Sequence, residues 1–244
     1  MIIIGTFSAS KDKAFCSPHR TILTKPVTLG SIIGWKYGSI LNPIEGSVHD
    51  LEIIFVRHGQ GVHNTNIPDR LNTVNPHLTE RGRQQVTALK SEFAFHEDDV
   101  FIVSPTIRTI ETVNIMSSDL NSPHKYVSPL VGPRMFPMPS NPEAFASKCD
   151  LNYPLCEITK DHSDFIVLEE DNQQLWNLGV NTLKESEFIP LGWSLINWLK
   201  KLAAKRVFIV AHDGTITNYR ILLGESGLTR SDFLGEAGWY KMNI

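Results

Sequence analysis

The stretch EIIFVRHGQGVHN, residues 52–64, changes abruptly from an apolar run to charged and small residues. Residues 53–56 are β-branched or aromatic, which predicts a strand buried on both faces. Arg57, His58 and Gly59 follow directly. Ligands of open α/β sheets bind beyond the carboxyl ends of the strands, so Arg57 and His58 are candidate site residues. A strand that ends in a solvated turn would carry the same residue types, and this stretch alone leaves both interpretations open.

Two further stretches have the same design. In RVFIVAHDGT, an apolar strand over residues 207–211 ends at His212 and Asp213. A second apolar strand, residues 99–103, ends at SPTIRTIETV, where we expect Ser104 to cap a helix that carries Arg108 in its first turn. Charged side chains therefore follow three apolar strands, which favours a shared site over a set of unrelated turns.

The remaining pattern alternates strands with helices. The strand before Arg57 is predicted to span residues 51–56, a further strand is predicted at 125–127, and an antiparallel edge strand at 239–244. Helices are predicted at residues 77–93 (capped by Thr79), 104–113, 192–205 and 215–223. This alternation predicts an α/β three-layer sandwich with a mostly parallel central sheet and helices on both faces.

Two segments stand outside that alternation. Residues 1–50 hold many prolines and glycines, and we expect an N-terminal arm packed on the main domain, residues 51–244. Its Ser/Thr-rich, mildly basic composition resembles a transit peptide weakly, and an irregular arm is preferred. Residues 132–186 hold five prolines and no clear periodicity. A long segment of this kind inside a domain is usually functional, which predicts an insertion over the active site.

Composition excludes several classes of protein. The chain has 244 residues, of which 41% are hydrophobic and 20% charged, and its formal net charge is −3. A nucleic-acid or membrane-surface partner would require a basic excess, and no apolar run is long enough to span a membrane. Three cysteines without metal-ligand spacing indicate free thiols and a cytoplasmic location. The oligomeric state stays open.

The residues after the strands suit the chemistry of a phosphoryl group. Arg57 and Arg108 offer forked, permanently charged donors for a dianion. A neutral imidazole, His58 or His212, can attack phosphorus, and the other cationic or polar groups stabilise the charge that develops. A carboxylic acid must protonate the leaving alkoxide. No metal-binding motif is present, so neither a metal nor another cofactor is expected.

Five motifs in this order resemble the histidine phosphatase superfamily, and more closely its phosphoglycerate-mutase-like phosphatases. They are RHG at 57–59, Asn64, LTERG at 78–82, SPxxRxxxT at 104–112 and AHDG at 211–214. The resemblance implies that His58 is the phosphorylated nucleophile. It also implies that Arg57, Arg108 and His212 form the phosphate pocket and that Asn64 adds an amide donor. Cys149-Asp150 and Trp176 match features of these phosphatases loosely, and we expect Cys149 and Asp150 to shape the substrate entrance.

The proton donor departs from the family pattern. Many mutase-like members carry a Glu after the third strand, whereas this chain has no acid between Pro129 and Asn141. The acid phosphatase branch uses an Asp directly after its second histidine, which favours Asp213. Glu143 is the alternative donor, and Asp213 also suits a helix cap.

Four further residues are candidates for a place near the phosphate pocket. Gln60 is assigned to orient water or substrate. Arg134 is either an anion contact or a surface residue, and His63 either lines the pocket or is solvated. Trp176 is expected to pack the insertion, with a place over the pocket as the alternative.

The sequence therefore predicts a metal-independent phosphoric monoester hydrolase that acts on a small phosphorylated substrate. A phosphoglycerate-mutase-like phosphoryl transfer is the alternative, but the Gly-Trp-x-Asp segment that mutases carry before the LTxxG helix is missing here. A non-catalytic phosphate-binding module is the third reading. Substrate selectivity should come from residues 132–186.

Overall fold

The computed structural model describes residues 51–169 and 172–244, so the predictions for the arm at residues 1–50 lie outside the described residues. Six strands form one sheet in the order β4-β3-β2-β5-β1-β6. They are β1 (Glu52–Arg57), β2 (Val100–Val103), β3 (His124–Val127), β4 (Ile166–Val167), β5 (Arg206–Ala211) and β6 (Trp239–Asn243). Strands β1 to β5 run parallel to one another. Strand β6, at one edge of the sheet, pairs antiparallel with β1. The mostly parallel sheet and the antiparallel last strand are confirmed.

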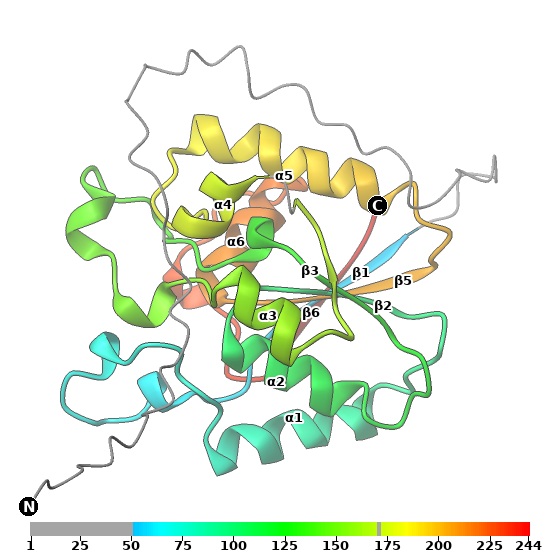
Figure 1. Ribbon diagram of the computed structural model, residues 1–244. Coiled ribbons are helices and arrows are strands. Elements are labelled where there is room, and N and C mark those ends of the chain that lie inside the picture. Colours follow the sequence, from blue (N-terminus) through cyan, green and yellow to red (C-terminus); the bar gives the residue numbers. More distant parts are fainter. Residues whose placement is uncertain (1–50, 170–171) are drawn as a thin grey trace, which may run out of the picture. The chain divides into compact units, whose positions relative to one another are not determined.

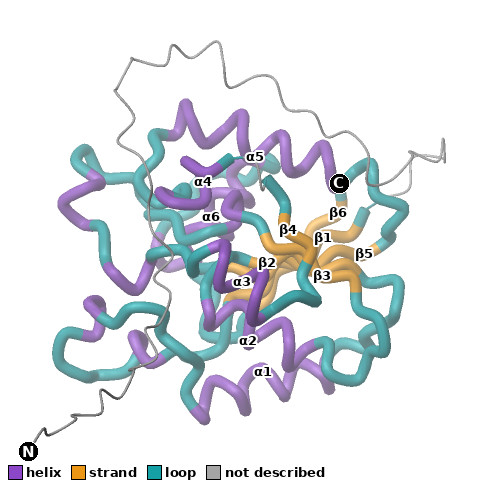
Figure 2. Tube along the Cα trace, in the orientation of Figure 1, coloured by secondary structure: helices purple, strands orange, loops and turns teal. Residues whose placement is uncertain are grey.

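Helices cover both faces of this sheet (Figures 1 and 2). They are α1 (Glu80–Glu92), α2 (Ile107–Met116), α3 (Leu155–Asp161), α4 (Gln173–Leu178), α5 (Glu185–Leu199) and α6 (Asp213–Leu222). Figure 1 places α1 and α2 on one side of the strands and α5 and α6 on the other. The predicted three-layer α/β architecture is therefore present in the described chain.

Side chains alternate between the two faces along each strand, which explains why helices pack on both faces of the sheet. Ile54 and Val56 of β1 belong to a buried cluster with Val86 of α1 and Val113 of α2. Phe55 points to the opposite face, where its ring lies 6.2 Å from that of Tyr219 in α6. Because alternate side chains of a strand point to opposite faces, one apolar run supplies both halves of the core.

Helix boundaries differ from the sequence prediction in two places. Thr106, not Ser104, is the N-cap of α2, which begins at Ile107. The Ser104 N–H instead donates to the Val210 carbonyl of β5 (3.0 Å). Ser104 therefore continues the backbone pairing of β2 with β5 beyond the last residue of β2. The predicted helix over residues 192–205 is α5, which begins at Glu185 and ends at Leu199. The helix therefore includes Pro190, which has no N–H to donate to the preceding turn.

The segment at residues 132–186 contains more regular structure than its sequence pattern indicates. It forms α3, α4 and the two-residue strand β4, which extends the sheet beside β3. A strand this short has no periodicity to detect, and α4 has only six residues. The boundaries of the proposed insertion remain a prediction.

Candidate active site

The parallel register brings the residues that follow β1, β2 and β5 together at the carboxyl ends of these strands. Arg57 pairs with Ala211, and Val103 pairs with Val210, so β1, β2 and β5 end at the same level. The His58 N–H donates to the Ala211 carbonyl at 3.1 Å, which fixes the start of the loop after β1. His58, Ser104 and His212 are consequently neighbours although they are far apart in the sequence.

Arg108 is the centre of this group. It sits in the first turn of α2, and its side chain is 1% exposed. Its Nε donates to His58 Nε2 (3.3 Å), and its Nη2 donates to His212 Nδ1 (3.1 Å). Nη1 donates to the Cys149 carbonyl (2.7 Å). One buried guanidinium thus touches both histidines and the segment that follows β3.

The hydrogen bonds of His58 define which ring nitrogen is free to react. His58 Nδ1 lies 2.7 Å from the Gly59 carbonyl oxygen, which can only accept, so Nδ1 carries the proton. Nε2 then holds the lone pair and faces Arg108. Burial lowers the pKa of His58 well below its usual range, and Arg108 lowers it further. His58 is therefore a neutral imidazole with an available Nε2 lone pair, the form that a nucleophile requires.

His212 is held in the opposite tautomer. Arg108 can only donate, so His212 Nδ1 accepts from it, and His212 Nε2 carries a proton that it donates to Ser104 Oγ (2.8 Å). Burial is the main reason that the pKa of His212 is well below its usual range. The ring centroids of His58 and His212 are 5.1 Å apart. Sequence reasoning assigned Ser104 to a helix cap and missed this contact.

His63 belongs to the same group, which settles one open interpretation. Its side chain is buried, and its ring centroid is 5.6 Å from that of His58. Its Nδ1 is buried without a hydrogen-bond partner among the described residues. Burial, followed by Arg108, lowers the pKa of His63 to about 3. The residue is not a solvated loop histidine, and its neighbours Val62 and Asn64, one apolar and one polar, gave no signal of its burial.

Arg57 and Asp213 form an ion pair at this edge. Arg57 Nη2 lies 3.2 Å from Asp213 Oδ2, and Arg57 Nη1 donates to the Leu234 carbonyl (2.6 Å). Asp213 Oδ1 accepts from the Gly214 N–H (2.7 Å). Arg57 Nε is buried and has no partner in the described part of the chain. The Asp213 carboxylate lies in the first turn of α6, where an anion is favoured.

A second carboxylate reaches the site from the predicted insertion. Asp150 Oδ1 lies 3.4 Å from Arg108 Nη2, and the Asp150 side chain is 30% exposed. Burial is the largest cause of the raised pKa of Asp150, and Arg108 opposes it. The neighbouring Cys149 is buried, and its thiol pKa is raised to about 11, mainly by burial. Asp150 therefore lies beside Arg108 and reaches solvent.

Gln60 and Asn64 contact protein groups around the loop after β1, and their assignment to the substrate stays a prediction. The Gln60 side chain accepts from Thr79 Oγ1 (2.9 Å) and donates to Glu236 (3.2 Å), so it ties the loop after β1 to the start of α1. Asn64 Oδ1 accepts from the Gly61 N–H (2.9 Å) and shapes the same loop. Glu143, the alternative proton donor, is exposed in a short 3-10 helix. These contacts give Gln60 and Asn64 a loop-supporting role in the described structure.

Arg134 and Trp176 are packing residues. Arg134 is 3% exposed, and its Nη1 donates to the carbonyls of Val180 and Leu183 (2.9 and 2.7 Å). Its guanidinium carbon lies 4.1 Å from the centre of the Phe188 ring. Trp176 is buried, and its Nε1 donates to the Glu169 carbonyl (3.0 Å). The surface alternative for Arg134 is wrong.

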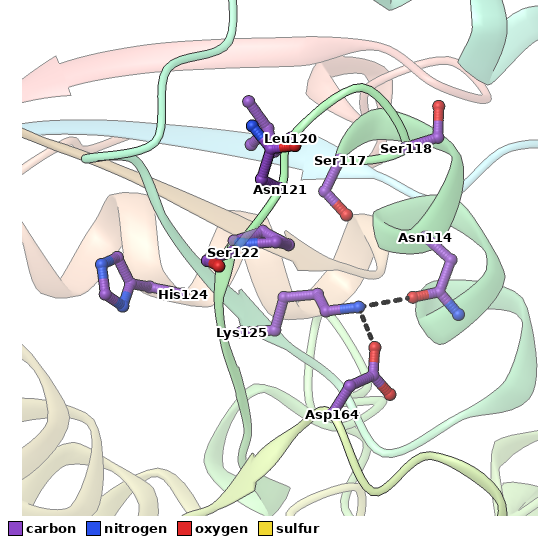
Figure 3. A pocket seen from close by; sticks show the side chains of 10 residues that line it. Asn114, Ser117, Ser118, Leu120, Asn121, Ser122, His124, Lys125 and Asp164 are labelled. Atoms are coloured by element: carbon purple, nitrogen blue, oxygen red, sulfur yellow. Dashed lines mark hydrogen bonds and ion pairs between the residues drawn. The ribbon is translucent and has the colours of Figure 1, made fainter.

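A hollow of about 680 Å³ lies away from these residues. Its lining includes His124 and Lys125 at the amino end of β3, whereas the candidate site is at the carboxyl ends of the strands. In Figure 3 the Lys125 ammonium points to Asn114 and Asp164, and it bonds to both. Its charge is thereby neutralised, so the hollow does not present a free cation to an anionic ligand.

Among residues 51–169 and 172–244, no group of three or more His, Cys, Asp and Glu side chains could hold a metal ion. In the same ranges, no helix has the length and apolar character needed to cross a membrane.

Comparison with known proteins points to one family. Residues 53–130 match the family model of the histidine phosphatase superfamily (branch 1). No curated protein matches the sequence. Among solved structures, the ecdysone phosphate phosphatase of Bombix mori, in complex with tungstate, is similar with a TM-score of 0.55 and 16% identity over 79% of this chain and 88% of that one. Mycobacterial hydrolase 1 is similar with a TM-score of 0.50 and 15% identity, covering 79% and 91% of the two chains. At these identities the likeness shows a common fold.

Proposed function

We propose that this chain, which carries the histidine phosphatase superfamily segment at residues 53–130, is a metal-independent phosphomonoesterase that forms a phosphohistidine on His58. The observation that carries the proposal is the pair of hydrogen bonds on His58. Nδ1 is held by the Gly59 carbonyl, which leaves the Nε2 lone pair beside the cationic Arg108. This is the arrangement that in-line attack on a phosphate ester requires.

The other residues of the site are assigned to the phosphoryl oxygens. Arg108 and Arg57 supply guanidinium donors. Arg57 is the last residue of β1, and Arg108 is in the first turn of α2, just after β2. His212 is neutral in this structure, and proton uptake on substrate binding would make both its nitrogens donors. Because these groups are buried, their electrostatic stabilisation of the transition state is stronger than it would be in water. Asp213 remains the sequence-predicted proton donor, and Gln60 and Asn64 remain predicted contacts.

The substrate is expected to be a small phosphorylated compound. Arg57, Arg108 and the histidines recognise only the phosphoryl group, so the remainder must be recognised by residues 132–186, from which Cys149 and Asp150 reach Arg108. The free thiols of Cys149 and Cys156 suit the reducing compartment that a cytoplasmic enzyme occupies.

Hydrolysis of p-nitrophenyl phosphate in the presence of EDTA tests the proposal. We expect turnover by the wild type and a loss of about 10³-fold or more in His58→Ala, because the nucleophile is removed. His96→Ala is the matched control, since His96 is exposed and precedes β2 at the other end of the sheet. Acid-labile, base-stable labelling from a radioactive substrate, absent in His58→Ala, would identify the phosphohistidine.

Two results would contradict the proposal. Wild-type turnover that disappears in EDTA and returns with a metal would remove metal independence. Binding of inorganic phosphate without turnover of any phosphate ester would support the non-catalytic binding module instead.

A further inference from the structure

Hydrolysis of an unactivated phosphate ester requires a proton donor for the leaving oxygen. Two described carboxylates, Asp213 and Asp150, contact the arginines of the candidate site. Glu143 is exposed in a short 3-10 helix, and among the described residues it has no hydrogen bond or ion pair with Arg57, Arg108 or the histidines of the site. The assignment of the donor therefore depends on the environments of the two aspartates.

Asp213 is arranged as an anion. Both its oxygens are engaged, Oδ2 with Arg57 (3.2 Å) and Oδ1 with the N–H of Gly214 (2.7 Å). An N–H or guanidinium donor favours the ionised carboxylate, and so does the amino-terminal turn of α6. A carboxylate held in this way orients Arg57, and both its oxygens already have donors.

Asp150 is arranged differently. Its contact with Arg108 Nη2, at 3.4 Å, is long for a charge-assisted bond. The Cys149 thiol, 3.8 Å from Asp150 Oδ1, is a weak donor. Burial is the largest cause of the raised pKa of Asp150, and the nearby Asp213 adds to it. Arg108 and hydrogen bonds from Cys149 and Asn181 oppose these effects. The Asp150 side chain nevertheless keeps 30% of its surface accessible to solvent.

We infer that Asp150, supplied by the segment after β3, is the general acid of the reaction, in place of the predicted Asp213. The inference rests on the proposed function. The geometry behind it is one guanidinium, Arg108, whose Nε touches the nucleophile and whose Nη2 touches Asp150. A phosphoryl group bound to Arg108 would have His58 on one side and the carboxyl of Asp150 near its ester oxygen.

The proposed reaction has two steps. The lone pair of His58 Nε2 forms a bond to phosphorus, the ester P–O bond breaks, and the leaving oxygen takes the electron pair and the proton of Asp150. In the second step, water attacks phosphorus and gives its proton to the Asp150 carboxylate, while the P–N bond breaks and returns the electron pair to His58. The carboxyl is restored without an external acid.

The test compares leaving groups. p-Nitrophenolate leaves without help, whereas an alkoxide such as that of glycerol 2-phosphate needs the proton. We expect Asp150→Asn to lower kcat/KM for glycerol 2-phosphate by about 10²-fold or more and for p-nitrophenyl phosphate by less than 10-fold. Asp213→Asn should affect both substrates by the same factor. Asp161→Asn, at the end of α3, is the control for loss of a carboxylate.

Asp150→Glu is the control that separates loss of the acid from misfolding. It keeps a carboxyl group, so it should recover much of the activity on glycerol 2-phosphate. The alkaline limb of the kcat/KM profile for this substrate should also be absent in Asp150→Asn. Equal losses on both substrates in Asp150→Asn would overturn the inference and leave Asp150 as a positioning residue for Arg108. A leaving-group-dependent loss in Asp213→Asn would also overturn it. Failure of the proposed function would be recognised separately, as wild-type inactivity on both esters.

Discussion

At the scale of single residues, Arg108 determines the state of the site. Its two contacts hold His58 and His212 as opposite neutral tautomers, one with an unprotonated Nε2 that accepts from Arg108 and the other with a protonated Nε2. A lysine could not do this, because its single ammonium lacks the planar fork of donors. The chemistry proposed for the two histidines therefore depends on a side chain from a third element, α2.

Ser104→Ala tests how far His212 depends on its partner. Ser104 is fully buried and accepts from His212 Nε2 (2.8 Å), so we expect kcat to fall about 10-fold as the ring loses its orientation. Ser117→Ala is the matched control, since Ser117 is also buried and donates one bond, to the Val113 carbonyl (2.9 Å). Both variants should lose about 1 kcal/mol of stability. An equal effect on kcat in both would contradict a specific role for Ser104.

At the scale of elements, the loop after β1 packs so closely against the start of α1 that neither Gly59 nor Gly82 could carry a side chain. A Cβ on Gly82 would lie 2.1 Å from the Gln60 carbonyl oxygen, and one on Gly59 would lie 2.5 Å from the Gly82 carbonyl oxygen. Thr79 caps α1 by accepting from the Gly82 N–H (3.0 Å), as predicted. The LTERG motif is thus a docking surface for the loop that carries His58.

Gly82→Ala should consequently disturb both stability and activity. The added methyl group must push the loop away, and we expect a loss of about 2 kcal/mol or more in unfolding free energy and a fall in kcat. Gly235→Ala is the control, because its Cβ would meet nothing within 4 Å. Chemical denaturation and p-nitrophenyl phosphate turnover measure the two effects. A fully stable and active Gly82→Ala would show that the loop can shift without consequence.

Arg134 joins several elements of the fold through its Nε and Nη1. It donates to Val180, Leu183 and, through Nε, to Asn218 Oδ1 of α6 (3.1 Å). We expect Arg134→Met to lower the unfolding free energy by about 2 to 4 kcal/mol, because three acceptors lose a buried partner. KM for a simple phosphate ester should be unchanged in protein that remains folded. A KM increase without destabilisation would restore the anion-contact interpretation.

At the scale of the whole molecule, the site makes stability depend on pH. Burial lowers the pKa values of His58, His63 and His212 below their unfolded value of about 6.5. Their contribution is fully present above that pH and is lost as pH falls toward the folded values, since the unfolded chain binds more protons. Each histidine contributes a slope of up to about 1.4 kcal/mol per pH unit.

Denaturant unfolding at pH 7.5 and at pH 5.5 measures this dependence. We expect the wild type to be less stable at pH 5.5, and His63→Gln, which cannot titrate, to show a smaller difference between the two conditions. The exposed His96 supplies the comparison, and His96→Gln should retain the wild-type difference. Stability that is unchanged or higher at pH 5.5 would contradict the burial of three neutral histidines.

Much of the fold could be predicted from local pattern. The apolar runs before Arg57 and His212 predicted β1 and β5, and Thr79 predicted the start of α1. The edge strand β6 was also predicted from its sequence. The two-residue β4 and the short helices α3 and α4 could not be predicted, because their pairing and burial come from contacts distant in the sequence. Ser104 was misassigned for the same reason, since its backbone pairs with β5.

By itself the sequence determined the buried parallel strands and the charged residues after them, because β-branched runs and glycine turns act over a few neighbouring residues. Tertiary structure alone decided the tautomers of His58 and His212, the burial of His63 and the approach of Asp150 to Arg108. These properties depend on which groups meet across the sheet edge and on how much water they exclude. Burial and charge then set the proton positions, and no local run of residues encodes them.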